Sequence, residues 1–546
     1  MKQTALFLLA STLFTACAYK DKEVDLVVHN AQIFTLDGQN TRQTAMAIKD
    51  GRIVELGAEY QILNRYRATT VYDAATNIIY PGFIDGHCHF LGYGLNKQKV
   101  DLSGSKSWAE AVQRVVAYAQ AHPGTSWVLG RGWDQNLWPG QANPVNDTLN
   151  RLFPDRPVLL QRVDGHAAVV NQQALDQAGL TATSTIAGGL LEKKNGRLTG
   201  LLLDNAVGVF QTIFNEADEA TKRKALLDAQ RDCMAAGLTM VCDAGLDAGT
   251  IELLKRMQAE GALKVRVYAM LADDSVNFER YNSGPFISER LVVRAVKCYA
   301  DGALGSRGAL LLEPYSDDPS AGHGLQLASR AHFLKVAQWC KAKGFQMATH
   351  CIGDSADRLL LGVYGEVLGG TNDLRWRIEH AQCMDTADFH LFGRYNIIPS
   401  VQPTHATSDM SWALDRLGPQ RLANAYALRR LMQQNGMVAL GTDFPVEGID
   451  PLKTFYAATV RKNGEGLPPQ GFQMEDALTR EEALRGMTVW NALATFTEAD
   501  LGSLEVGKKA DFVVVSRDLL SVGEDQLPKA AVHATFIHGE QVWPAR

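Results

Sequence analysis

The sequence predicts an α/β protein built on a (β/α)8 TIM barrel, with a structured insertion after the first barrel strand and a small β-sandwich made from both chain ends. Eight short apolar segments in the middle of the chain alternate with helical stretches, which implies a parallel sheet closed into a barrel. Both ends of the chain are rich in alternating, β-branched residues. The first two apolar segments are separated by far more chain than one helix needs.

The chain begins with a segment typical of a secretory signal. In MKQTALFLLASTLFTAC a single basic residue precedes an apolar run that is too short to span a bilayer. The last four residues, FTAC, resemble a bacterial lipobox, with Phe where Leu is commonest. We therefore predict a signal peptide at residues 1–16, a lipid anchor at Cys17, and a tether at residues 17–23. The protein would then be exported as a membrane-anchored lipoprotein of the cell envelope facing the periplasm, and an ordinary cleaved signal is the alternative.

The two β-rich ends predict one composite β-sandwich over residues 24–79 and 500–546. Residues 24–36 (VDLVVHNAQIFTL) alternate, and AMAIKDGRIVELG follows with a turn signal at Asp50-Gly51. These segments are predicted to form antiparallel hairpins. GSLEVGKKADFVVVSRD and AVHATFIHGEQVW have the same pattern at the far end of the chain.

Residues 80–499 are predicted to form the barrel. Amphipathic stretches such as SRAHFLKVAQWCKAKG lie between many of its strands. Residues 97–215 form the predicted insertion, which is structured because it contains WVLGRGWDQNLWPG and RPVLLQRVDGHAAVVN. The strand candidates are residues 79–86, 238–243, 264–271, 291–299, 344–350, 374–379, 396–402 and 437–442.

Composition excludes some classes of partner. The chain of 546 residues is 46% hydrophobic and 21% charged, as in soluble globular proteins, and its formal net charge of −6 provides no basic field for nucleic acid. The expected partner is a small-molecule substrate, with membrane contact only through the anchor at Cys17. The oligomeric state is left open. The eight cysteines show no disulfide framework, so those other than Cys17 are expected to be buried free thiols.

Residue types that bind metals recur at the carboxyl ends of the predicted strands. Active sites of such barrels assemble at this face from several strands, so residues far apart in the chain are expected to meet there. The candidates are His87 and His89 at the first strand, Lys297 at the fourth, His350 at the fifth, His380 at the sixth and Asp443 at the eighth.

PGFIDGHCHF raises the question of which residues in its His-Cys-His triplet are ligands. Side chains alternate along a strand, so His87 and His89 face one side and Cys88 the other. Cys298 and Cys351 likewise come one residue after a candidate ligand. We therefore predict two ligands and a buried bystander.

Six motifs carry a resemblance to a known family. They are PGFIDGHCHF, VKCYADGALGSRGA, ATHCIGD, IEHAQ, VQPTHA and GTDFPVE. The chain resembles the amidohydrolase superfamily and is most similar to its amidohydrolase-3, N-substituted formamide deformylase-like branch. The resemblance covers essentially the whole mature chain, including both β-rich ends and the insertion.

The resemblance implies a binuclear centre of divalent metal ions, with zinc fitting its nitrogen and oxygen ligands best and manganese or iron as alternatives. Lys297 would take up CO2 to form a carbamate, because an ammonium would repel two cations whereas a carbamate offers each an anionic oxygen. His87, His89 and Asp443 would bind the more buried metal, His350 and His380 the more exposed one, and Lys297 would bridge both.

This centre implies a hydrolase that cleaves non-peptide C–N bonds in amides or cyclic amides by a metal-activated hydroxide. Asp443 would be the catalytic residue that passes the water's proton to the leaving nitrogen. One alternative is a mononuclear deaminase-like site using His87, His89, His350 and Asp443. Another is a non-catalytic, ligand-binding envelope lipoprotein. For Lys297, the alternative is a structural salt bridge to Asp301 or Glu313.

Four further residues are candidates for substrate binding, each with a structural alternative. Arg307, with Asp301 beside it, either binds a substrate carboxylate or orders its loop. His166 either closes the barrel mouth from the insertion or is locally hydrogen-bonded. Trp133, like Trp138, either lines an apolar pocket or belongs to a core. His405 either contacts the substrate or leaving group, or orients a ligand.

Overall fold

The computed structural model describes residues 22–210, 213 and 217–545. The predicted signal peptide and Cys17 lie outside the described residues, and the last two residues of the predicted tether already belong to strand β1 (Lys22–His29). No helix in the described parts of the chain combines the length and apolar character needed to cross a bilayer.

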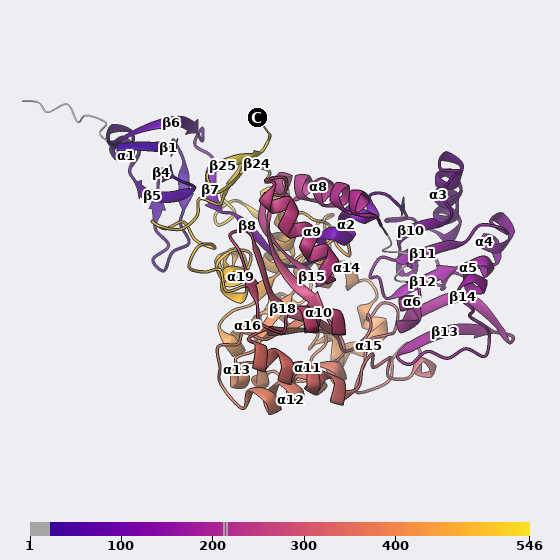
Figure 1. Ribbon diagram of the computed structural model, residues 1–546. Helices are drawn as coiled ribbons and strands as arrows, with labels where there is room; N and C mark the ends of the chain where they lie inside the picture. Colours follow the sequence, from indigo (N-terminus) through magenta and orange to yellow (C-terminus); the bar gives the residue numbers. More distant parts are fainter. Residues whose placement is uncertain (1–21, 211–212, 214–216, 546) are drawn as a thin grey trace, which may run out of the picture.

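Eight parallel strands form the barrel at the centre of the molecule, which confirms the predicted fold class (Figure 1). Each strand except the last pairs in parallel with the next one around the barrel. The strands are β8 (Phe83–Cys88), β15 (Leu238–Leu246), β16 (Arg266–Ala272), β18 (Leu291–Tyr299), β19 (Gln346–Cys351), β20 (Arg377–His380), β21 (Ile398–Val401) and β22 (Ala439–Leu440). A short strand, β17 (Phe286–Ile287), pairs with β18 from outside.

The segment that follows β22 closes the barrel against β8. The Asp443 N–H donates to the His87 carbonyl at 2.8 Å, and the His89 N–H donates to the Phe444 carbonyl at 2.8 Å. The Asp85 carboxylate also accepts from the Thr442 N–H at 3.0 Å and from its hydroxyl at 2.7 Å. The ends of the first and last strands are therefore fixed together directly beneath the predicted ligands.

Helices surround the barrel and bury their apolar faces against it. The largest apolar cluster joins strands of the barrel to residues of α8, α9, α11 and α12, so the core lies between strands and helices. These helices are α2 (Phe90–Asn96), α8 (Glu219–Ala235), α9 (Ala248–Ala259), α10 (Ser275–Arg280), α11 (Arg330–Lys343), α12 (Asp354–Leu368), α13 (His390–Tyr395), α14 (Pro403–Asp409), α15 (Ala413–Leu422), α16 (Leu428–Asn435), α17 (Pro451–Val460), α18 (Arg480–Gly486) and α19 (Val489–Ala494).

Two small sheets at one end of the molecule form the sandwich (Figure 1). One sheet has the order β5-β4-β1-β6, and the other, β25-β24-β23-β7-β2-β3, combines strands from both chain ends. Apolar side chains of both sheets share one core. The strands after β1 are β2 (Gln32–Phe34), β3 (Arg42–Gln43), β4 (Ala45–Lys49), β5 (Arg52–Gly57), β6 (Tyr66–Asp73), β7 (Ile78–Pro81), β23 (Phe512–Val515), β24 (Val532–Ile537) and β25 (Glu540–Trp543), with helix α1 (Glu59–Arg65) between β5 and β6.

The sandwich differs from the prediction in two details. Residues 24–36 do not form a hairpin, because β1 and β2 belong to different sheets. The strand candidate 79–86 is two strands, β7 in the sandwich and β8 in the barrel, separated at Gly82. A Cβ at Gly82 would lie 2.4 Å from the Thr239 side chain, so only glycine fits where the chain passes from one sheet to the other.

The insertion after α2 is a separate six-stranded mixed sheet with its own apolar cores, on the opposite side of the barrel from the sandwich (Figure 1). Its order is β13-β14-β12-β11-β10-β9. Its strands are β9 (Val100–Asp101), β10 (Val128–Trp133), β11 (Val158–Arg162), β12 (Ala167–Val170), β13 (Gly189–Lys194) and β14 (Arg197–Asp204), and its helices are α3 (Trp108–Ala121), α4 (Asp147–Leu152), α5 (Gln172–Gln177) and α6 (Asn205–Gly208).

Candidate metal centre

A first group of possible metal ligands forms where β8 and β22 end. His87 is the penultimate residue of β8, and His89 comes directly after this strand. Asp443 follows β22. Asp443 Oδ1 is 3.3 Å from His89 Nε2 and 3.7 Å from His87 Nε2. The donor atoms of these three residues all lie within 4.8 Å of one another, as one cation would require.

A second group shares the same carboxylate. His380, which ends β20, His405 on α14, and Asp443 also hold their donor atoms within 4.8 Å of one another. Asp443 Oδ2 is 3.6 Å from His405 Nε2. The sequence predicts that His405 contacts the substrate or orients a ligand, and the structure places it among the possible ligands.

His350 lies beside the second group without belonging to it. Its ring centroid is 4.6 Å from that of His380, but its Nε2 is 3.4 Å from the Gly302 carbonyl oxygen. The described residues thus group His380 with His405, whereas the sequence prediction paired His380 with His350.

The two groups fit metal ions because they contain polar atoms without a partner. Asp443 Oδ1 and His405 Nε2 are buried and have no hydrogen-bond partner among the described residues. Burial opposes ionisation of Asp443, but its close approach to His89 and the nearby histidine charges outweigh burial and hold its pKa well below its usual range. A bound cation would satisfy an ionised carboxylate and a histidine that otherwise lack partners.

Lys297 extends from β18 into the same place. Its Nζ is 3.0 Å from His87 Nε2, and the residue is only 1% exposed. Burial lowers the pKa of this amine to about 8, so a larger fraction is uncharged at neutral pH than in water. The alternative salt bridges do not form: Asp301 instead accepts the backbone N–H groups of Ile352 and Gly353, and Lys297 has no carboxylate partner within 4 Å in the described residues.

A buried carboxylate orients His87. His87 Nδ1 donates to Glu379 at 2.5 Å, because a carboxylate can only accept, and this leaves Nε2 for a metal. Arg377 holds Glu379 through two hydrogen bonds of 2.7 and 2.8 Å, and all three residues are completely buried. Burial alone would raise the pKa of Glu379, but the Arg377 charge outweighs it and keeps the pKa well below its usual range.

A second orienting residue, Gln402, acts on His380. His380 Nδ1 lies 2.6 Å from the Gln402 side-chain oxygen, which leaves its Nε2 for a metal. Glu379 and Gln402 were missed by sequence reasoning. Their position in the chain is the one available signal: Glu379 directly precedes a ligand in WRIEHAQ, and Gln402 directly follows a buried strand in VQPTHA.

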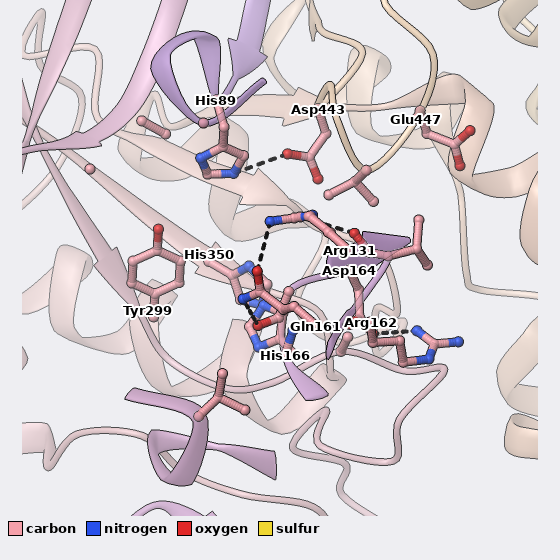
Figure 2. Close-up of a pocket in the computed structure, with 18 of the residues that line it drawn as sticks. His89, Arg131, Gln161, Arg162, Asp164, His166, Tyr299, His350, Asp443 and Glu447 are labelled. Carbon is pink, nitrogen blue, oxygen red and sulfur yellow. Dashed lines mark hydrogen bonds and ion pairs between the residues drawn. The ribbon is translucent and has the colours of Figure 1, made fainter. Parts of the chain in front are cut away.

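At the mouth of the barrel lies a cavity of about 900 Å³ that is lined by residues of both the barrel and the insertion (Figure 2). His166 lines this cavity; its Nδ1 is 2.8 Å from Asp204, and its ring lies 4.9 Å from that of His350. The insertion therefore brings a histidine against the metal side of the cavity.

Two predicted substrate residues do not reach the cavity. Trp133 is wrong as a substrate contact: it is fully buried in the core of the insertion, and its Nε1 donates to the Leu160 carbonyl. The register of β10 shifts between Arg131 and Trp133, so Arg131 lines the cavity while the Trp133 side chain joins the apolar core. Arg307 is 2.8 Å from Asp317 and is not among the lining residues, so the loop-ordering alternative holds.

Comparison with known proteins identifies the family. The model of a family described as the amidohydrolase family matches residues 70–543. The chain belongs to this amidohydrolase family. Amidohydrolase YtcJ of Bacillus subtilis is 31% identical over 94% of the chain and 98% of its own length. N-substituted formamide deformylase of Arthrobacter pascens is 26% identical over 94% of the chain and 97% of its length.

A solved structure extends the likeness to the fold. A metal-dependent hydrolase from Pyrococcus horikoshii is 27% identical, with a TM-score of 0.74 over 92% of this chain and 99% of its own. This amidohydrolase is thus similar over nearly its whole length to metal-dependent hydrolases, with its candidate ligands at the mouth of the barrel.

Glu379→Gln should weaken metal binding to this amidohydrolase by roughly 10- to 100-fold, because His87 loses the carboxylate that orients and polarises it. Metal affinity is measured by competition with a chelator of known affinity. Glu498→Gln is the matched control, since Glu498 also pairs with an arginine, Arg375, but at the surface. Equal metal affinity in Glu379→Gln and the control would contradict the orienting role.

Cys88→Ala should keep metal content and activity and lower stability by about 1 kcal/mol. Cys88 is fully buried in the core between barrel and helices, and its Sγ is 3.4 Å from the Cys242 carbonyl, on the side away from the histidines. All seven cysteines of the described residues are buried and free. His89→Ala, one residue away, should lose metal, and thermal unfolding with metal analysis separates the two. Stoichiometric metal loss in Cys88→Ala would show that the thiol faces the site.

Proposed function

We propose that this amidohydrolase cleaves carbon–nitrogen bonds other than peptide bonds, in amides or cyclic amides. The position of Asp443 carries the proposal, because its two oxygens face two separate groups of nitrogen donors. A carboxylate between two groups suits a binuclear hydrolytic centre. The relative named N-substituted formamide deformylase supports a carbon–nitrogen bond as the target.

Two divalent ions are proposed, with zinc expected and manganese or iron as alternatives. His87, His89 and Asp443 would hold one ion, and His380 with His405 or His350 would offer donors to the other. The uncharged amine of Lys297 would attack CO2 and release a proton to solvent, which forms a carbamate. The anionic carbamate would then stand next to His87 where the protonated lysine would otherwise place a cation.

The chain's own residues then have defined tasks. Bound metals supply a Lewis acid for the carbonyl oxygen and make water acidic enough to ionise near neutral pH. Asp443, ionised because its pKa is low, takes the proton of the attacking water on a carboxylate oxygen and passes it to the leaving nitrogen. His87 stays uncharged because burial lowers its pKa to about 4, so its Nε2 lone pair remains available.

Metal counting tests the proposal together with turnover. Purified protein refilled with zinc in bicarbonate should hold two metals per chain and hydrolyse members of a panel of amides, lactams and N-formyl amines. One metal per chain with full activity would favour the mononuclear, deaminase-like alternative. Two metals without turnover on an extended panel would favour the ligand-binding alternative.

We also propose that the protein is exported and anchored to the membrane of the cell envelope through a lipidated Cys17, as the FTAC segment indicates. Mass spectrometry of the mature N-terminus should find acyl chains on Cys17, and Cys17→Ser should release the protein from the membrane fraction. An unmodified N-terminus at another residue would contradict the anchor and leave the ordinary cleaved signal.

A further inference from the structure

Arg131, on strand β10 of the insertion, presents a cation to the cavity without a carboxylate partner. Its side chain donates to the Gln161 side-chain oxygen at 3.2 Å and to the Val163 carbonyl at 2.9 Å. A guanidinium has five N–H donors, so three remain unused among the described residues, and the buried Nε is one of them. In the view of Figure 2 this guanidinium lies between Asp443 on the barrel side and Gln161 on the insertion side.

The other cations that line the cavity are already neutralised or belong to the metal site. Arg162, on the next strand, pairs with Asp134 and Asp164. Lys222 lies 3.8 Å from Asp247, and Lys297 lies against His87. In the described chain, Arg131 is therefore the one arginine or lysine of the cavity lining that lacks both a carboxylate partner within 4 Å and a place at the metals.

The guanidinium is held in place before any ligand arrives. Gln161 accepts from Arg131 with its side-chain oxygen and donates to the Gly165 carbonyl at 3.0 Å, which fixes the orientation of the amide. Gly165, at φ +80°, lies flat against the guanidinium; a Cβ there would come within 3.3 Å of Nη2. The loop from Val163 to Gly165 thus holds the Arg131 guanidinium in a fixed orientation.

We propose that Arg131 binds a carboxylate at the end of the substrate remote from the scissile bond, so that this amidohydrolase acts on anionic amides such as N-acyl amino acids or N-acyl ω-amino acids. The inference rests on the proposed hydrolytic function and names its substrate class. The insertion would then select the substrate while the barrel performs the reaction.

The chemistry of the Arg131 guanidinium favours a carboxylate as its ligand. Parallel N–H donors of a guanidinium match the two oxygens of a carboxylate, and hydrogen bonds between charged groups are stronger than those between neutral ones. Asp443 on the barrel and Arg131 on the insertion line the same cavity, and Figure 2 draws them near each other. A molecule in the 900 Å³ cavity can therefore reach both.

The acidic residues of the cavity offer a competing specificity. Asp409 and Glu447 also line it, and burial raises the pKa of both, to about 7 for Asp409. Each already accepts a hydrogen bond, from Tyr426 and Ser408 respectively. A preference for a cationic substrate end would show that these acids, rather than Arg131, set the specificity.

Hydroxamates with a variable far end test the proposal. A hydroxamate binds divalent metals, so the monohydroxamates of linear dicarboxylic acids with two to six methylene groups place a carboxylate at graded distances from the metal site. The matched probes replace this carboxylate with a primary amide or an amine. Affinity for zinc-loaded protein is measured by isothermal titration calorimetry.

At the best chain length the carboxylate probe should bind roughly 10- to 100-fold tighter than the amide probe, as expected for a hydrogen bond between charged groups. Arg131→Gln should reduce this ratio to less than threefold, Arg131→Lys should keep part of it, and Lys222→Met should keep all of it. Unchanged affinity for the amide probe shows that a variant is folded. A ratio near one in the wild type at every length, a ratio that survives Arg131→Gln, or a preference for the amine probe would overturn the proposal.

The same experiment separates this inference from the proposed function. A clear carboxylate preference in a protein that hydrolyses no amide would support the Arg131 site and contradict the proposed reaction. Hydrolysis of neutral amides with no carboxylate preference would support the reaction and contradict the Arg131 site. A protein that binds none of the hydroxamates would contradict both.

Discussion

Lys297→Ala is expected to lower amide hydrolysis on the order of 10³-fold and to leave at most one zinc ion per chain. Lys297 reaches the ligand group from β18, with its Nζ 3.0 Å from His87 Nε2, so a carbamate formed there would offer the metals anionic oxygen in place of a cation. Loss of one metal removes several kcal/mol of charge stabilisation from the transition state, and each 1.36 kcal/mol is a factor of ten in rate. Metal content by plasma mass spectrometry and kcat on a panel substrate measure the two effects.

Cys298→Ala is the matched control for Lys297→Ala. Cys298 is the next residue in β18 and is buried in the core on the helix side of the barrel. It should keep two metals and kcat within threefold. Two metals and near-normal kcat in Lys297→Ala would reduce the lysine to a structural role and exclude the carbamate.

Asp443→Asn, compared with the wild type at equal metal content after refilling with zinc, should lower kcat by roughly 10²- to 10⁴-fold, since a positioned proton acceptor contributes about this much. An asparagine keeps the shape and one carbonyl oxygen, but its amide cannot take a proton from water. The pKa of Asp443 lies well below its usual range, so the residue is ionised and able to accept at neutral pH.

Asp243→Asn provides the comparison for Asp443→Asn. Asp243 lines the same cavity at the end of β15, but its oxygens accept the N–H groups of Phe90 and Leu91 at the start of α2. An asparagine can still accept one of these hydrogen bonds, so kcat should stay within tenfold. If kcat of Asp443→Asn decreased by less than tenfold with two metals present, another residue would have to accept the proton.

The barrel was predictable because its strands are buried on both faces and appear as separate apolar runs of similar length. The boundary between sandwich and barrel was not, because β7 and β8 are one continuous apolar run. Only the contact of Gly82 with Thr239, which comes from a distant strand, shows that the chain changes sheets there. Packing of this kind leaves no local pattern.

The ligands were predictable because strand ends converge on one face of a barrel, whatever their separation in sequence. Residues that act on the ligands were not, since Glu379 depends on Arg377 and Ser400 around it, and a buried carboxylate has no signature of its own. Trp133 was a wrong substrate candidate because β10 has an irregularity in register between Arg131 and Trp133, so that Arg131 lines the cavity while Trp133, two residues on, joins the core.

The composite sandwich has a consequence for how the protein is made. Strand β7 leads directly into the first barrel strand, yet it pairs with β23, which is synthesised near the end of the chain. The chain must therefore emerge almost completely before β7 has its final neighbour, and contacts between residues so far apart in sequence slow folding. A product ending before residue 512 would expose β7 as an apolar edge, and such edges recruit other chains. Premature termination should thus produce aggregates rather than a shortened enzyme.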